Sequence, residues 1–212
     1  MKALIVSGGE KPSTGLLKEV AYESELIIGA DKGCDSLYDS NIVPKYIVGD
    51  FDSANIDKVN YLKECGAIKI EFNPEKDFTD SNSALNLAIE EGAREIILLG
   101  VTGTRLDHTF GNFGLLTIAL KRNVKATIIN ENNKIFIVNN SICLKRDNRY
   151  KYISFLAYGD VVKKLNIINA KYNLKNYDLF MGDTTTVSNE FIDEKMYIEF
   201  ESGKLLVIYS KD

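Results

Sequence analysis

The sequence predicts two folds in succession: a mainly parallel α/β sheet with helices on both faces, then a small antiparallel β-sandwich. Up to about residue 130, short apolar runs alternate with segments of helical periodicity, which is typical of right-handed βαβ units. After that point there is no convincing helix, and short β-like runs follow one another between turn residues. We therefore expect an α/β domain over residues 1–130 and an all-β domain over residues 131–212.

Six strands are expected in the first domain, because six short apolar runs are bounded by polar or turn residues. They are ALIVSGG (3–9), ELIIGAD (25–31), KYIVGDFDS (45–53), AIKIEF (67–72), REIILLG (94–100) and KATIIN (125–130). Helices are expected between them, at 13–22, 34–39, 55–64, 80–92 and 108–122. The last helix is apolar on most sides, so we expect it to be deeply packed.

Five β-like runs are expected to build the second domain, with turn residues such as Gly159-Asp160 and Ser202-Gly203 between them. They are KIFIVNN (134–140), YKYISFLA (150–157), KLNIINAKYNL (164–174), KMYIEFE (195–201) and KLLVIYS (204–210). Short strands at this spacing are typical of a small antiparallel sandwich.

The composition excludes several classes of protein. The chain has 212 residues, 45% of them hydrophobic and 26% charged, with a net charge of −4. This balance argues against nucleic acid or an anionic membrane as the main partner. The apolar run before Gly8 is too short for a secretory signal, and no stretch approaches a membrane span. Three cysteines, far apart, show neither a disulfide framework nor zinc-ligand spacing, so we expect a reduced, cytoplasmic protein.

Aspartates gather where predicted strands end, and open parallel sheets bind ligands at that edge. The second strand ends in Asp31, the third in Asp50 and Asp52, and the fourth runs into Asp77 and Asp80. Side chains two apart on a strand share a face, so the two aspartates of the third strand should reach one point.

Any one of these aspartates could instead be a helix cap or a turn residue; Asp52 or Ser53 suits the helix at 55–64, and Thr79 or Asp80 the next one. Five together would repel one another unless a cation lay between them. Mg²⁺ suits this set, because it takes oxygen ligands and is usually shared with substrate phosphates. Zinc is disfavoured, because the chain has a single histidine.

Three further features border the same edge of the sheet. The turn Ser7-Gly8-Gly9 would permit close backbone approach to a phosphate, or is an ordinary strand-to-helix turn. Arg105 could clamp a phosphate, or could pair with a nearby aspartate. His108 is more easily understood as a positioning or helix-start residue than as a general base.

Five segments together resemble the motif series of the thiamine pyrophosphokinase (thiamine diphosphokinase) family. They are GADKG (29–33), VGDFDS (48–53), EKDFTDSNSAL (75–85), GVTGTRLDHTFGN (100–112) and LFMGDTTTVSNEF (179–191). The resemblance covers nearly the whole chain and implies an N-terminal α/β domain and a C-terminal β domain. It also implies a homodimer with thiamine bound between subunits, and transfer of the pyrophosphoryl group of ATP to thiamine, using Mg²⁺ and releasing AMP.

The resemblance also implies a role for each candidate residue. The residues implied to hold Mg²⁺ are Asp31, Asp50, Asp52, Asp77 and Asp80; those implied in catalysis are Asp50, Asp52, Asp80 and Arg105; those implied at ATP are Ser7, Gly8, Gly9 and Arg105; those implied at thiamine are Asp107, His108, Ser188, Asn189 and Phe191. One carboxylate, not identified from the sequence, would accept the proton of the thiamine hydroxyl.

Two other functions remain open at this point. Another Mg²⁺-dependent nucleotidyl- or phosphotransferase would explain the first domain, but not the TVSNE segment of the second. A non-catalytic sensor of thiamine or nucleotide would be expected to lack one of the metal-binding aspartates, and none of the five is missing. A purely structural role leaves the group of aspartates unexplained.

Overall fold

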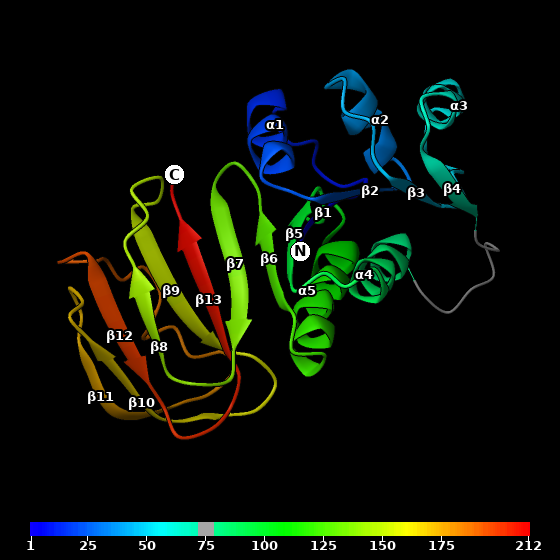
Figure 1. Ribbon diagram of the computed structural model, residues 1–212. Coiled ribbons are helices and arrows are strands. Elements are labelled where there is room, and N and C mark those ends of the chain that lie inside the picture. The colour runs from blue at the N-terminus through cyan, green and yellow to red at the C-terminus, as the bar shows by residue number, and fades with distance from the viewer. Residues whose placement is uncertain (72–78) are drawn as a thin grey trace. The chain divides into compact units, whose positions relative to one another are not determined.

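The computed structural model describes residues 1–71 and 79–212, and the chain divides into two compact units, Met1–Glu131 and Asn132–Asp212 (Figure 1). Each unit has its own hydrophobic core. Within the described ranges, no helix is both long enough and apolar enough to cross a membrane.

The first unit is built on a parallel sheet with the strand order β4-β3-β2-β1-β5-β6. Its strands are β1 (Lys2–Val6), β2 (Leu26–Ala30), β3 (Tyr46–Gly49), β4 (Ile68–Glu71), β5 (Glu95–Leu99) and β6 (Lys125–Ile129). The central strands are buried on both faces, which explains why they are continuous apolar runs in the sequence. The order reverses between β1 and β5, and the carboxyl ends of strands beside such a reversal are where α/β sheets bind ligands.

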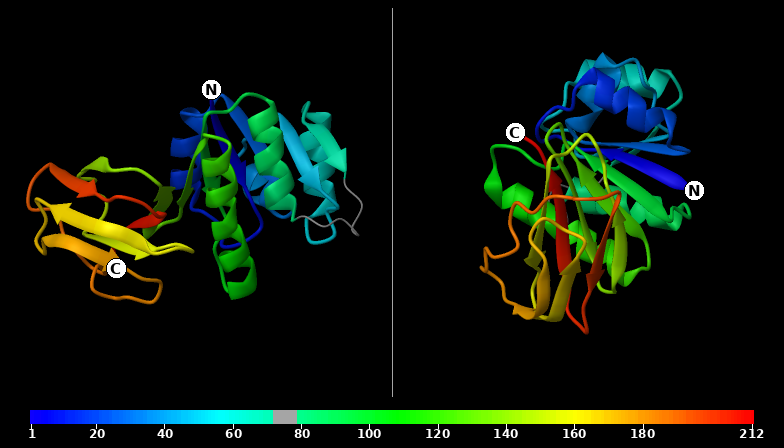
Figure 2. Two further views of the ribbon diagram at one scale, coloured as in Figure 1. Left: turned by 90° about the horizontal axis from the view of Figure 1, so that it is seen from below. Right: turned by 90° about the vertical axis from the view of Figure 1, so that its left-hand side faces the viewer.

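Helices cover both faces of this sheet. α1 (Thr14–Tyr22), α2 (Gly33–Asp39) and α3 (Ile56–Glu64) lie on one face, and α4 (Asp80–Glu90) and α5 (Leu106–Lys121) on the other (Figures 1 and 2). The expected deep packing of the last helix is wrong for its first half. Leu106 and Phe110 are 65% and 69% exposed, and the buried residues of α5 lie only in its second half.

The second unit is a sandwich of two antiparallel layers, β7-β13-β9 and β11-β10-β12-β8. Its strands are β7 (Asn133–Val138), β8 (Ile142–Lys145), β9 (Tyr152–Ala157), β10 (Val162–Ile168), β11 (Leu174–Leu179), β12 (Lys195–Glu199) and β13 (Leu205–Ser210). Side chains from both layers, such as Phe155, Leu165 and Met196, are fully buried between them. The predicted fold class is confirmed.

Three strand predictions need correction. The run 164–174 is not one strand but the end of β10 and the start of β11, because Asn169 takes a left-handed backbone (φ 65°) and the chain turns there. β8 was not predicted, since its four residues are too few to show a clear alternation. The third strand ends at Gly49 instead of continuing to residue 53.

Candidate active site

The turn after β3 carries Asp50 and Asp52, but not on a shared strand face as expected. Both aspartates follow the last strand residue, and Phe51 between them has a left-handed backbone (φ 61°). This turn brings the two side chains together by another route, and the Asp52 N–H donates a hydrogen bond to Asp50 Oδ1 at 3.2 Å. The buried Phe51 ring holds the turn against the first unit, with Lys69 Nζ 4.9 Å from its centroid.

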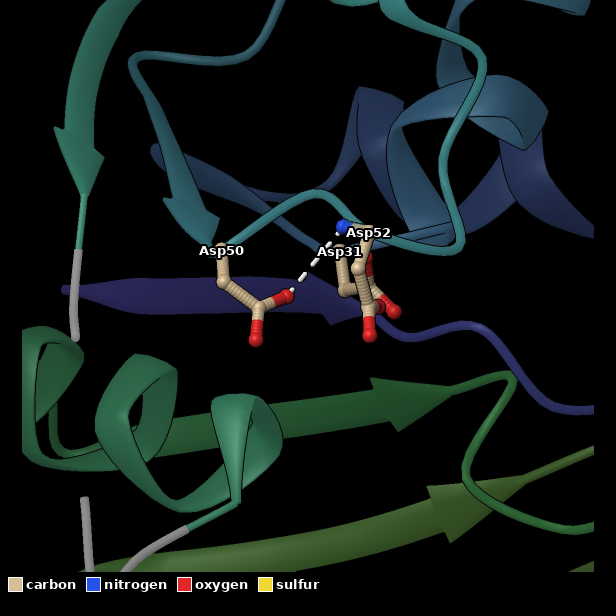
Figure 3. Close-up of side chains that lie close together, drawn as sticks. All are labelled: Asp31, Asp50 and Asp52. Atoms are coloured by element: carbon tan, nitrogen blue, oxygen red, sulfur yellow. Dashed lines mark hydrogen bonds between the residues drawn. The ribbon is translucent and has the colours of Figure 1, made fainter. Parts of the chain in front are cut away.

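A third carboxylate joins them from the end of β2. Asp31, Asp50 and Asp52 each offer one oxygen, and these three oxygens lie within 4.8 Å of one another (Figure 3). Asp31 also has a left-handed backbone (φ 47°), and its N–H donates to the Val48 carbonyl at 2.8 Å, which fixes it to the neighbouring strand. We call these three residues the aspartate cluster.

Asp31 has an oxygen that needs a partner. Its Oδ2 accepts a hydrogen bond from the Ser53 hydroxyl, whereas its Oδ1 is buried and has no hydrogen-bond partner among the described residues. Burial raises the pKa of this carboxyl above its ordinary value, and the nearby charges of Asp80 and Asp52 add to the effect. A buried carboxylate oxygen without a partner is costly, and a bound cation would offset that cost.

The aspartates of the cluster are not helix caps. Asn55 caps α3 by accepting from the N–H groups of Asp57 and Lys58, so neither Asp52 nor Ser53 has that role. α2 begins without any side-chain cap, so Asp31 does not have it either. The helix-cap explanation therefore does not hold for the cluster, whereas Asp50 does have a turn role, because it accepts the Asp52 N–H.

The two other predicted metal ligands, Asp80 and Asp77, are not part of the aspartate cluster. Asp80 is the first residue of α4, which is capped by Thr79, and it is close enough to raise the pKa of Asp31. Asp77 lies outside the described residues. The donor set of the cluster is all carboxylate oxygen, which fits a hard cation such as Mg²⁺ and not zinc.

The turn Ser7-Gly8-Gly9 is occupied by contacts within its own unit. The N–H groups of Ser7 and Gly9 donate to the carbonyls of Leu99 and Gly100 at 2.9 and 2.7 Å. A Cβ on Gly9 would lie 2.3 Å from the Thr102 carbonyl oxygen, so glycine is required by this close approach of the two chain segments.

The Ser7 hydroxyl is buried and accepts a hydrogen bond from Ser81 at 2.9 Å, which ties β1 to the first turn of α4. Two N–H groups and the hydroxyl of this turn therefore have partners already.

Arg105 forms an exposed ion pair with an aspartate at the start of α5. Its Nη2 and Nε lie 2.6 and 3.3 Å from the two carboxylate oxygens of Asp107 at the start of α5. These hydrogen bonds lower the pKa of Asp107 to about 2. His108 Nε2 is 4.0 Å from Asp107, and all three side chains are exposed to solvent.

Of the three second-unit residues predicted to bind thiamine, Ser188 is exposed, and Asn189 and Phe191 are buried. Ser188 is exposed with a left-handed backbone (φ 58°), and its N–H donates to Ser154 Oγ at 2.9 Å. Phe191 is buried in the sandwich core, with its ring centroid 5.8 Å from that of Tyr209, so it is not positioned to stack on a ligand within this unit.

Asn189 is 2% exposed, and its amide bonds to neighbouring backbone. Its Oδ1 accepts from the N–H groups of Tyr172 and Glu190 at 3.0 and 2.9 Å, and its Nδ2 donates to the Tyr172 carbonyl at 2.7 Å. The Tyr172 side chain is 58% exposed. Asn189 therefore fixes the backbone of Tyr172, a residue whose side chain lies at the surface.

Two residues of this region were not predicted from the sequence. Ser53 orients Asp31, and only its position inside VGDFDS could have suggested this. Ser81 reaches Ser7 across the sheet, and nothing local in the sequence reports a contact between residues so far apart along the chain.

The comparisons with known proteins agree over the full length. The family model for the thiamin pyrophosphokinase catalytic domain matches residues 17–128, and that for the thiamin pyrophosphokinase vitamin B1 binding domain matches residues 139–205. The thiamine pyrophosphokinase of Bacillus subtilis is 34% identical over 209 residues, 98% of each chain.

Solved structures agree as well. The crystal structure of the Bacillus subtilis thiamine pyrophosphokinase covers all of both chains, with a TM-score of 0.90 and 32% identity. That of the Geobacillus thermodenitrificans enzyme covers 100% of this chain and 98% of its own, with a TM-score of 0.86 and 32% identity. With the aspartate cluster at the expected edge of the expected sheet, the chain belongs to the thiamine pyrophosphokinase family.

Proposed function

We propose that this enzyme transfers the pyrophosphoryl group of ATP to the hydroxyl of thiamine, giving thiamine diphosphate and AMP, and that it requires Mg²⁺. The observation that carries the proposal is the aspartate cluster, with the buried unpartnered Oδ1 of Asp31. Family membership supplies thiamine diphosphate as the product. ATP as donor, Mg²⁺ as metal and AMP as second product are inferences from the site chemistry and the family resemblance.

Asp31, Asp50 and Asp52 would hold Mg²⁺, with Asp80 nearby, and the family resemblance assigns Asp77 to the metal as well. When bound, the metal would neutralise and orient the phosphates of ATP. Reactions of this kind depend mainly on positioning and charge stabilisation, so the protein needs few groups that form covalent bonds. Any cluster carboxylate left outside the metal shell would be free to accept the proton of the thiamine hydroxyl.

Thiamine is a flat cation, so an acidic site with an exposed aromatic side chain suits it. We assign Ser188 and Tyr172 to the thiamine side of the reaction, with Asn189 as the residue that positions Tyr172. Asp107 and His108 are assigned to thiamine on the family resemblance alone. Phe191 would act indirectly, through its packing against Tyr209 in the core of the second unit.

A homodimer with thiamine between subunits is also part of the proposal. Each unit exposes apolar side chains, Leu106 and Phe110 on α5 and Phe180 and Met181 after β11, and a subunit interface would cover surface of this kind. We further propose that the enzyme works in the cytoplasm, because its three cysteines are free and unpaired by disulfides. Light scattering of the active protein tests the dimer: a strictly monomeric active enzyme contradicts it.

The test of the function is turnover of thiamine with ATP, with and without Mg²⁺, in the wild type and in Asp52→Asn. The variant removes one charge of the cluster with little change of shape. Thiamine diphosphate should form only with the divalent metal present, and the variant should fold normally and lose turnover by about 100-fold or more. Saturable thiamine binding with no turnover by the wild type would instead favour the sensor, and near-wild-type turnover by the variant would contradict the metal site.

A further inference from the structure

We propose that Lys32 binds the polyphosphate of ATP and supplies the positive charge that the glycine turn beside it does not. The inference rests on the proposed function, because it takes ATP as the ligand. Lys32 directly follows Asp31 of the aspartate cluster in the chain.

Lys32 lies between the segment that carries Gly8 and the aspartate cluster. A Cβ built on Gly8 would lie 2.8 Å from the Lys32 Cβ, so the root of the lysine side chain lies directly beside Gly8. Lys32 thus stands between two features that converge at the carboxyl ends of β1 and β2: the aspartate cluster and the Ser7-Gly8-Gly9 turn. Its flexible four-carbon stem can carry the ammonium group over either.

The turn needs such a cation, because most of its own donors are already used. The N–H groups of Ser7, Gly9 and Glu10 donate to carbonyls on the segment 99–102, and the Ser7 hydroxyl accepts from Ser81. A loop that cradles phosphate does so with free backbone N–H groups, whereas two N–H groups of this turn and that of the following Glu10 already donate to backbone carbonyls.

Three other cations of the first unit are paired. Arg105 makes a two-pronged ion pair with Asp107, and Lys11 and Lys58 both pair with Asp39, at 2.7 and 2.6 Å. Lys32 is exposed, and within residues 1–71 and 79–212 its ammonium group makes no ion pair. A triphosphate arriving beside three carboxylates brings more negative charge than one divalent cation neutralises, so an unpaired lysine at this position has a clear electrostatic role.

The test compares Lys32→Gln with Lys32→Arg and with Lys18→Gln. Lys18 lies on α1, is exposed, and also makes no ion pair within the described ranges, so it controls for loss of one charge. Binding of ATP and of AMP, each with Mg²⁺ and without thiamine, is measured by calorimetry. Lys32→Gln should weaken ATP binding about 10- to 100-fold, the range for losing one charge-assisted hydrogen bond, and AMP binding no more than about threefold. Lys32→Arg should restore most of the ATP affinity, and Lys18→Gln should match the wild type.

A second measurement separates phosphate binding from support of the cluster. Mn²⁺ binding without nucleotide, followed by electron paramagnetic resonance, should be equal or tighter in Lys32→Gln, because a nearby positive charge repels the metal. Weaker Mn²⁺ binding would show that Lys32 supports the aspartates and would overturn the proposal. So would ATP affinity within twofold of the wild type, or equal weakening of ATP and AMP. Wild-type turnover is measured in parallel: if it yields no thiamine diphosphate while the ATP result holds, the proposed function fails and the role of Lys32 stands.

Discussion

Replacing Asp31 by asparagine should make the metal-free protein more stable and the enzyme inactive. Two carboxylate oxygens within 4.8 Å of each other repel by at least about 3 kcal/mol at an effective dielectric constant of 20. Asp52 is exposed, so water and salt reduce this, and we expect a gain of about 1 kcal/mol. Asparagine tolerates the left-handed backbone of this residue, and its carbonyl can still accept from Ser53.

The assay is thermal unfolding at pH 7.5 with and without Mg²⁺. Asp31→Asn should unfold about 2–4 °C above the wild type without metal, and should show little of the stabilisation that Mg²⁺ gives the wild type. Asp57→Asn, an exposed aspartate on α3, removes the same charge away from the cluster and should keep the Mg²⁺ effect. An Asp31→Asn protein that is less stable without metal, or that keeps the full Mg²⁺ effect, would refute the reasoning.

Three further predictions concern the supporting structure. Ser81→Ala leaves the buried Ser7 hydroxyl without its hydrogen-bond donor. The variant should lose about 1–2 kcal/mol of unfolding free energy in urea titrations and bind Mn²⁺ more weakly. An unchanged unfolding free energy contradicts the prediction. Asn189→Ala frees Tyr172 and should raise the KM for thiamine more than that for ATP in steady-state kinetics; equal effects on both would contradict a positioning role. Asp147→Asn should lower the unfolding free energy at pH 7 by about 1 kcal/mol, because hydrogen bonds from Arg149 hold the pKa of Asp147 at about 2. This stabilisation is lost as pH falls through about 4 to 2, so the wild type and the variant should unfold alike near pH 2. A difference that stays constant with pH contradicts the prediction.

Most of the fold could be predicted because its signals are local. Apolar runs of strand length alternate with capped helical segments in the first unit, and the buried central strands have no polar face to confuse the pattern. Two of the errors fall where the backbone takes a left-handed conformation at a residue other than glycine. Asn169 divides one apparent strand into two, and Phe51 turns the chain after β3, and no propensity of either residue type forces that conformation.

The candidate site was predictable in its composition but not in its contacts. The aspartate cluster follows from strand ends in a parallel sheet, together with the family resemblance. Hydrogen bonds between residues far apart along the chain cannot be inferred from the sequence. Ser7, expected at ATP, accepts a hydrogen bond from Ser81, and Asn189, expected at thiamine, accepts one from the Tyr172 backbone N–H. In each case a buried polar group met its hydrogen-bonding need within the chain, which only the folded structure reveals.

Phosphorus NMR of a single reaction tests the central claim most directly. Purified protein is mixed with thiamine, ATP and Mg²⁺, and the phosphorus signals of all products are followed together. Transfer of the pyrophosphoryl group requires attack at the β-phosphorus, so thiamine diphosphate and AMP should rise together in equal amounts, and neither should form when the metal is chelated. ADP rising together with thiamine monophosphate would show attack at the γ-phosphorus and would contradict the account.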